Sequence, residues 1–290
     1  YVLGRKLYCV EVGLLAALFS AINFFLIVFS QNTRSYELLV LLTVVSFVLF
    51  FDLVKKRKFS TALWYAVACA ALVNTHYFGF LPVMSQAIFL IYLSCWPRFD
   101  RRLFVLGGGA GLCILVSIIP IFIYILKNLK KTDTWIPVPD GSFILDSLLW
   151  PFGDPSAALL SLVFLFIGLD SLIKNDRERM SLSLLLSWWF VGYSIAYVKS
   201  LFSTPVLSIK NVIVFVPAML VIVAYGVGRI KDCFAKGVVL VFMVVVSIAC
   251  FLTRSDLAES LRLEHDLRSP ALEIINSGKY TELYNKWFMS

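Results

Sequence analysis

Residues 60–96 read STALWYAVACAALVNTHYFGFLPVMSQAIFLIYLSCW and contain no Asp, Glu, Lys or Arg. The stretch is too long for one helix across a bilayer, whose hydrocarbon core of about 30 Å takes roughly 20 apolar residues. NTHYFGF (74–80) divides it into two short spans joined by a tight turn. Such a turn can be polar because it lies at the interface or lines a protein cavity. The stretch therefore predicts a helical membrane protein.

The composition of the whole chain supports this class. Of its 290 residues 60% are hydrophobic and 15% are charged, and the mean hydropathy is +0.87, whereas soluble domains have about 45–50% apolar and about 25% charged residues. We predict an all-α polytopic membrane domain over 1–252, followed by an outer-side tail over 253–290. The apolar blocks predict about nine spans: 10–29, 35–54, 60–75, 77–96, 103–126, 156–173, 180–198, 211–228 and 236–252.

Basic residues are concentrated on alternate loops, which indicates the orientation because cytoplasmic loops carry excess Lys and Arg. We expect a cytoplasmic start, a tail on the periplasmic or extracellular side, and a location in the cell's inner (plasma) membrane. The predicted inner loops hold Arg5, Lys6, Lys55, Lys56, Arg57, Lys58, Arg98, Arg101, Arg102, Lys174, Arg177, Arg179, Arg229, Lys231 and Lys236. The outer loops hold Arg34, Lys127, Lys130, Lys131, Lys199 and Lys210.

The net charge of +8 follows from this topology. The basic clusters are short and scattered over alternate loops, so nothing suggests nucleic acid as a partner. The six cysteines show no metal-ligand spacing, and no motif indicates a metal or a cofactor. We expect Asp52 and Asp170, at inner helix ends, to be solvated. The glycines of GGGAG (107–111) lie inside a span, where they would let helices approach closely.

The outer loops carry the more varied polar residues, and the longest is the interfacial segment 127–155. Within it, SFILDSLLW (142–150) places Ile144, Leu145, Leu148 and Leu149 along one helical face. Trp135 and Trp150 flank this segment, as aromatic residues do at membrane interfaces. We expect a short helix on the outer leaflet, which serves either as an interfacial anchor or as one wall of a groove for a lipid substrate.

Several segments, in order, resemble the bacterial GT-C-fold glycosyltransferases that use polyprenyl-phosphate sugars. This family includes protein-mannosyltransferase-like enzymes and their aminoarabinose- and galacturonic-acid-transferring relatives. The segments are GRKLYCVEVGLLAALFSAINFFLIVFSQNTRSYELLVLL (4–42), NTHYFGF (74–80), TDTWIPVP (132–139), STPVLSIKNVIVFVPAMLVIVAYGVG (203–228) and, more weakly, HDLRSPALEII (265–275). The resemblance covers nearly the whole chain.

The resemblance implies a GT-C-like fold and a site on the outer side. Arg34 matches the family's first-turn arginine, and Lys210 stands in place of another arginine, before a helix N-terminus that favours an anion. Both are candidates to bind the donor phosphate; the alternative is a basic side chain that snorkels at the interface. The candidates to line the substrate site are Gln31, Asn32, Tyr36, His76, Tyr77 and Asn211. For His76 and Gln31 the alternative is a turn-forming role.

The implied reaction transfers a sugar from a polyprenyl-phosphate carrier to a lipid, glycan or protein acceptor. A carboxylate acts as general base on the acceptor, and basic residues neutralise the leaving lipid phosphate. In the family the principal carboxylate lies in the first outer loop, so we expect it upstream of Tyr1. Asn32 stands where the family usually has an acid, although Glu37 lies close by in the sequence.

Two other functions are compatible with this sequence. A transporter or flippase of lipid-linked sugars also needs many spans, but it should carry paired ionisable residues at mid-span and inverted repeats. The predicted spans carry neither, which favours the enzyme. A non-catalytic membrane scaffold is the third possibility.

Overall fold

The computed structural model describes residues 1–31, 34–96, 98–127, 136–153 and 155–253. The described chain is helical throughout and contains no strand. The first half comprises α1 (Val2–Leu7), α2 (Val10–Ile22), α3 (Phe24–Ser30), α4 (Tyr36–Lys56), α5 (Phe59–Thr75), η1 (Tyr77–Gly79), α6 (Phe80–Cys95) and α7 (Arg101–Lys127). The second half comprises α8 (Phe143–Leu149), η2 (Trp150–Phe152), α9 (Pro155–Ile173), η3 (Asp176–Glu178), α10 (Arg179–Leu186), the π-helical η4 (Ser187–Val191), α11 (Gly192–Phe202), η5 (Ile209–Phe215), α12 (Val216–Gly228) and α13 (Cys233–Thr253).

The predicted class, an all-α polytopic membrane protein, is confirmed. Among the described residues, seven helical segments are long and apolar enough to cross a membrane, or eight if a bent pair counts as one span. The predicted count of nine is not confirmed. α5 has only 17 residues, fewer than any of the seven candidate spans, in which η1 and α6 count as one segment, Tyr77–Cys95.

The predicted span 10–29 is broken in the structure. α2 and α3 meet at an angle of 57°, and Asn23 lies at the break. Its side-chain Oδ1 accepts a hydrogen bond from the Leu26 N–H (3.0 Å), and its Nδ2 donates one to the Pro151 carbonyl (2.8 Å). Asparagine caps a helix N-terminus well because its oxygen binds an otherwise unpaired backbone N–H. The apolar run therefore forms two helices.

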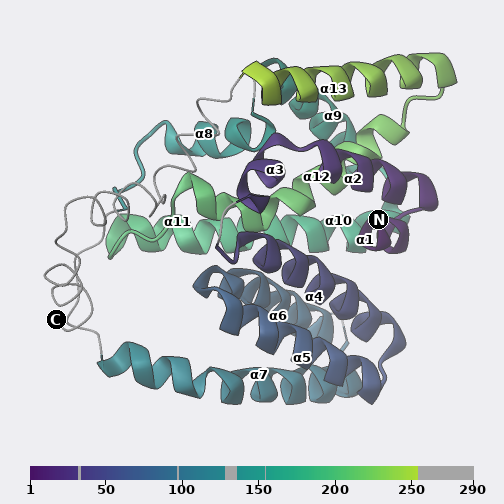
Figure 1. Cartoon of the computed structure of the whole chain (residues 1–290). Coiled ribbons are helices and arrows are strands. Elements are labelled where there is room, and N and C mark those ends of the chain that lie inside the picture. Colours follow the sequence, from purple (N-terminus) through teal and green to yellow (C-terminus); the bar gives the residue numbers. More distant parts are fainter. Residues whose placement is uncertain (32–33, 97, 128–135, 154, 254–290) are drawn as a thin grey trace, which may run out of the picture.

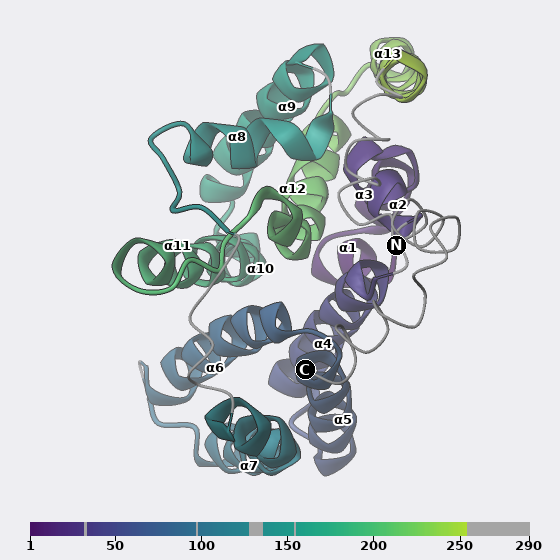
Figure 2. The ribbon, with the colours of Figure 1, turned by 60° about the vertical axis from the view of Figure 1, so that its left-hand side comes forward.

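The helices run side by side, with α4, α5, α6 and α7 on one side and α2, α9, α12 and α13 on the other (Figures 1 and 2). The segment Ile209–Gly228, which joins η5 to α12, is the most enclosed: 94% of its apolar window is buried, against 6% for α13. α13 and α7 lie at opposite edges of the bundle (Figure 1). The core is thus built around α12.

Glycines allow α12 to approach α9 closely. A Cβ atom added at Gly226 would run into the carbonyl oxygen of Phe164, and one added at Gly168 would run into that of Ile222. Small residues are enriched at helix contacts in membranes because they let backbones approach. The GGGAG segment behaves differently from our expectation: Gly107 packs against Leu90, but Gly108, Gly109 and Gly111 face open space and bring no helix close.

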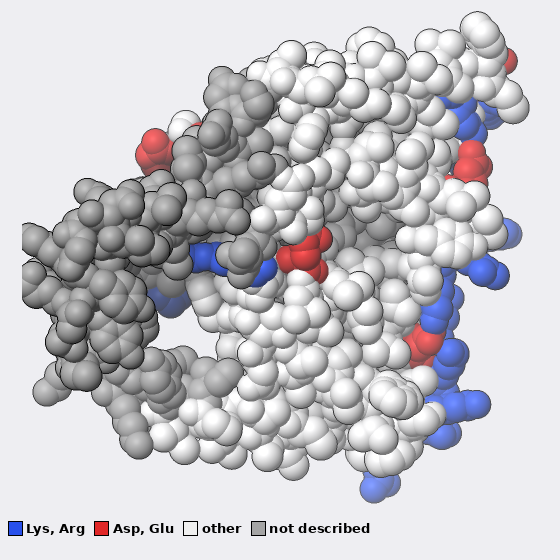
Figure 3. Space-filling view, viewed as in Figure 1, with Lys and Arg blue, Asp and Glu red and all other residues white. Residues whose placement is uncertain are grey.

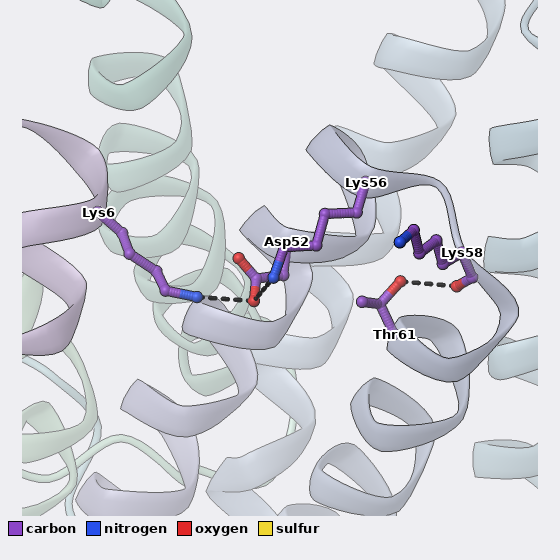
Figure 4. Close-up of polar contacts among 5 residues, drawn as sticks. All are labelled: Lys6, Asp52, Lys56, Lys58 and Thr61. Atoms are coloured by element: carbon purple, nitrogen blue, oxygen red, sulfur yellow. Dashed lines mark hydrogen bonds and ion pairs between the residues drawn. The ribbon is translucent and has the colours of Figure 1, made fainter.

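Charged side chains gather at one end of the bundle. Lys and Arg line the edge that is drawn on the right in Figure 3. Asp52, near the end of α4, lies between Lys6 (2.6 Å) and Lys56 (2.9 Å), as Figure 4 shows, and its side chain is only 14% exposed. The expectation that Asp52 is solvated is therefore wrong, whereas Asp170 is 62% exposed and pairs with Lys174. The paired carboxylate of Asp52 links α1 to α4.

The described part of the segment 127–155 contains the predicted short helix, α8 (Phe143–Leu149), whereas its position at the membrane interface stays a prediction. Ile144 and Leu145 are exposed, whereas Leu148 and Leu149 pack against the core. Ser147 joins α8 to α11 through a hydrogen bond with the Tyr193 hydroxyl (2.9 Å). The four apolar residues therefore do not share one exposed face, because α8 uses part of its apolar face for packing. Trp135 lies outside the described residues.

The glycine contact between α9 and α12 gives a stability prediction. We expect Gly226→Ala to lower the melting temperature in detergent, because overpacking a tight contact costs about 1–3 kcal/mol. Gly108→Ala is the matched control, since alanine is up to about 1 kcal/mol better than glycine in a helix and meets no neighbour there. Equal melting temperatures for the two variants in differential scanning fluorimetry would contradict the tight contact.

Candidate functional site

Three segments that are far apart in the sequence meet at one end of the bundle. They are the start of α4, the turn between α5 and η1, and η5. Tyr36 is buried at the start of α4, and its ring centroid lies 5.2 Å from that of Phe29 and 5.6 Å from that of His76. α5 runs between Lys58 and His76, so the NTHYFGF turn lies at the opposite end of this helix from the basic cluster around Lys56. A helix of 17 residues spans about 25 Å.

The NTHYFGF turn is held by its own residues. α5 ends at Thr75 because His76 adopts an extended conformation (φ −157°, ψ 140°). The His76 Nδ1 then accepts a hydrogen bond from the Phe78 N–H (3.1 Å) and caps η1. Gly79 lets η1 fold back onto α5, since an added Cβ would lie 2.5 Å from the Leu72 carbonyl oxygen. The polar and small residues of this stretch are thus required by the turn.

Aromatic contacts and one amide connect the turn to η5. The rings of His76 and Tyr77 stack with centroids 4.6 Å apart. The Asn211 Nδ2 donates hydrogen bonds to the Tyr77 hydroxyl (3.3 Å) and to the Val206 carbonyl (3.0 Å). Asn211 is buried, whereas Tyr77 is half exposed. The amide therefore fixes the hydroxyl end of a ring that is open to a ligand on its other side.

The electrostatics of the turn favour a neutral histidine. Burial, and then the nearby Arg34 guanidinium, lower the pKa of His76 below its ordinary value. Because Nδ1 accepts a hydrogen bond, the neutral ring carries its proton on Nε2. His76 therefore offers a hydrogen-bond donor beside a permanent positive charge. This combination suits a ligand that carries an anionic group and hydroxyl groups.

The two basic candidates differ in exposure. Arg34 is exposed, and its charge acts on His76. Lys210 is only 6% exposed in η5, next to Asn211, which does not fit a side chain that snorkels into water. Both lie near the NTHYFGF turn: Arg34, which is exposed, acts on His76, and Lys210, which is buried, adjoins the Asn211 that bonds to Tyr77.

The remaining candidates are less informative. Gln31 is exposed and follows the last residue of α3, which agrees with a turn-forming role. Asn32 lies outside the described residues. Two further residues belong to this cluster and were not predicted from the sequence: Phe29, which packs on Tyr36, and Ser35, whose Oγ donates to the Thr75 carbonyl (3.4 Å). Neither residue carries a motif, because a phenylalanine and a serine at helix ends are common in any membrane protein.

Comparison with known proteins finds no relative in which this arrangement has been described. The chain matches no protein-family profile, no curated protein and no solved structure. Within the described residues, no three His, Cys, Asp or Glu side chains come together as metal ligands would. The site is therefore defined by its own geometry, which brings Tyr36, His76, Tyr77 and Asn211 into contact and places Arg34 and Lys210 beside them.

The lowered pKa of His76 gives a pH dependence with a definite sign. Below the unfolded pKa of about 6.5 the unfolded chain binds a proton that the folded protein excludes. Stability should therefore fall as the pH drops from about 6.5 towards the folded-state pKa. We expect the melting temperature of the native protein to fall more between pH 7.5 and 5.5 than that of His76→Asn.

Asparagine is the matched substitution because its oxygen can accept the Phe78 N–H without titrating. The measurement is thermal unfolding in detergent at several pH values, with the difference between the two proteins as the readout. Parallel curves for the native protein and His76→Asn would show that the imidazole is not held in its neutral form.

Proposed function

We propose that this chain is part of a membrane glycosyltransferase that moves a sugar from a polyprenyl-phosphate carrier to a lipid, glycan or protein acceptor. The observation that supports the proposal is the meeting of the turns around Arg34, His76 and Asn211 at one end of the bundle. These turns are the ones whose sequence resembles GT-C enzymes, and they are separated along the chain. Because the three turns lie next to one another, their residues can act on one ligand, although they belong to separate motifs in the sequence.

The chemistry of the site suits a lipid-phosphate donor. Arg34 can pair with a phosphate through two parallel hydrogen bonds, and Lys210 supplies a second positive charge. The neutral His76 and the hydroxyl of Tyr77 can hydrogen-bond to sugar hydroxyls. Preorganised positive charges stabilise the phosphate that leaves when the sugar is transferred. Because the apolar helices surround the site, the lipid tail of the donor can remain in the bilayer.

The proposal includes an orientation in the plasma membrane. The end with the converging turns faces the periplasm or the cell exterior, and the basic end with Lys56 faces the cytoplasm. The tail 253–290 then lies on the outer side. This assignment follows the excess of Lys and Arg on cytoplasmic loops, and it puts the site where the donor head group of such enzymes is presented.

A transport function or a scaffold role predicts different behaviour in one experiment. The purified full-length protein is reconstituted in nanodiscs and in liposomes, and is supplied with an undecaprenyl-phosphate-linked sugar and a crude lipid acceptor fraction. Release of undecaprenyl phosphate together with a glycosylated product supports the transferase. Movement of the intact donor across the liposome membrane without product would support the flippase. If the protein neither forms product nor moves the donor, the scaffold role is favoured.

The positive charges of the site give a binding prediction. Removing a charged hydrogen-bonding partner costs about 1.5–3 kcal/mol, or a factor of roughly 10 to 150 in affinity. We expect Arg34→Ala and Lys210→Ala to weaken the binding of undecaprenyl-phosphate-linked sugar in detergent by such a factor. Lys210→Arg should preserve the affinity. The affinity is measured by microscale thermophoresis.

Two controls separate a local effect from a general loss of charge. Lys199, at the same end of the bundle, is exposed and donates to the Thr204 carbonyl, and Lys56 lies at the other end in the Asp52 pair. Lys199→Ala and Lys56→Ala should bind the donor like the native protein. If Arg34→Ala also binds like the native protein, the guanidinium has no role in holding the phosphate.

The orientation is tested by labelling from outside the cell. A membrane-impermeant maleimide should react in intact spheroplasts with Arg34→Cys but not with Lys56→Cys, both in a background where the native cysteines are replaced by serine. Both positions should react after the membrane is permeabilised. Reaction of Lys56→Cys in intact spheroplasts would reverse or refute the orientation.

A further inference from the structure

A groove of about 430 Å³ lies beside the candidate site, between α4 and the bent pair α2–α3. Glu37, Leu41 and Val44 line it from α4; Ile27 and Ser30 line it from α3, and Pro217 from α12. Glu37 directly follows Tyr36, the residue that contacts His76. Successive residues of an α-helix point about 100° apart, so Tyr36 faces the aromatic cluster while Glu37 faces the groove.

The groove is polar at one end and apolar along its length. Positions 37, 41 and 44 share one face of α4 because residues three and four apart are neighbours on a helix. Glu37 is in the first turn of α4, and Val44 lies about 10 Å further along the axis. Leu41 is 58% exposed on a membrane-spanning helix, so the groove opens towards the lipid. This shape fits a lipid chain with its head group near Glu37.

The polar side chains of the groove leave only acceptor positions for an occupant, because their hydroxyl hydrogens are already donated to the backbone. The Ser20 Oγ donates its hydrogen to the Ala16 carbonyl (2.7 Å), and the Ser30 Oγ donates its hydrogen to the Ile27 carbonyl (2.7 Å). The Glu37 Oε1 is buried, and no described residue donates a hydrogen bond to it. A buried carboxylate oxygen without a donor is costly. Glu37 also lines the groove, so an occupant that donates a hydrogen bond to its carboxylate is favoured.

We propose that this groove binds a lipid whose chain lies along α4 and whose hydroxyl or ammonium group donates a hydrogen bond to Glu37. Glu37 favours a hydrogen-bond donor, whereas the proposed phosphate position at Arg34 favours an anion, so the two positions bind different groups. If the proposed function holds, this lipid is the acceptor of the sugar.

The proposal is tested with three photoreactive lipids in nanodiscs, each carrying a diazirine in the same acyl chain. Phosphatidylethanolamine has an ammonium donor and phosphatidylglycerol has hydroxyl donors, whereas phosphatidylcholine has neither. We expect at least one of the first two to label residues 38–47 about tenfold more than phosphatidylcholine, because a hydrogen bond to a charged group contributes about 1.5–3 kcal/mol. The labelled residues are mapped by mass spectrometry.

Variants assign any preference to the carboxylate. Glu37→Leu should abolish the preference for the donor lipids, and Leu41→Trp should reduce labelling by all three because it fills the groove. Asp170→Asn, an exposed acid on α9, should change nothing. Equal labelling of the native protein by the three lipids overturns the proposal without any variant, and a preference that survives in folded Glu37→Leu also overturns it.

The labelling experiment measures binding and is independent of catalysis. A protein that transfers sugar but shows no head-group preference would reject the groove and keep the proposed function. A protein that shows the preference but never transfers sugar would keep the groove and reject the transferase.

Discussion

The close approach of α9 and α12 at Gly168 and Gly226 is the contact on which the arrangement of the bundle depends. In a membrane the lipid tails are as apolar as the side chains, so burial of apolar area does little to drive helices together, and tight packing matters more. α12 is enclosed because small residues let its neighbours come this near. η5 leads directly into α12 and places Lys210 and Asn211 next to the NTHYFGF turn. The position of the site therefore follows from the packing of the core.

The sequence predicted the fold class because a helical membrane protein must satisfy its backbone hydrogen bonds within each segment. Apolar blocks therefore became helices nearly where they were expected, from α4 to α13. It did not predict the break at Asn23, since capping by this residue depends on the Pro151 carbonyl, which lies in a distant segment. It also missed that Asp52 would be enclosed, because Lys6 reaches it from α1.

For the candidate site, the sequence identified the members but could not show that they meet. His76, Tyr77 and Asn211 were selected from separate motifs, and their contacts depend on how η5 packs against η1. The buried position of Lys210 could not be foreseen, because a lysine at the end of an apolar span usually extends into water. The neutral state of His76 likewise depends on burial and on Arg34, which only the fold brings near.

Among the described residues, four buried side-chain oxygens have no hydrogen-bond partner, those of Tyr8, Glu37, Ser94 and Glu178, and the Glu37 Oε1 is the one next to the site. Between α4, α5 and α6 the buried Gln86 accepts from the Tyr65 hydroxyl (3.0 Å) and donates to the Ser46 Oγ (2.8 Å), so both ends of its amide are bonded. The Glu37 Oε1 has no such donor among the described residues. α4 thus carries a bonded polar group, Ser46, where it packs on α6, and a carboxylate with one unpaired buried oxygen, Glu37, beside the groove. A structural role explains the first, whereas the second is one of the observations from which the lipid site is inferred.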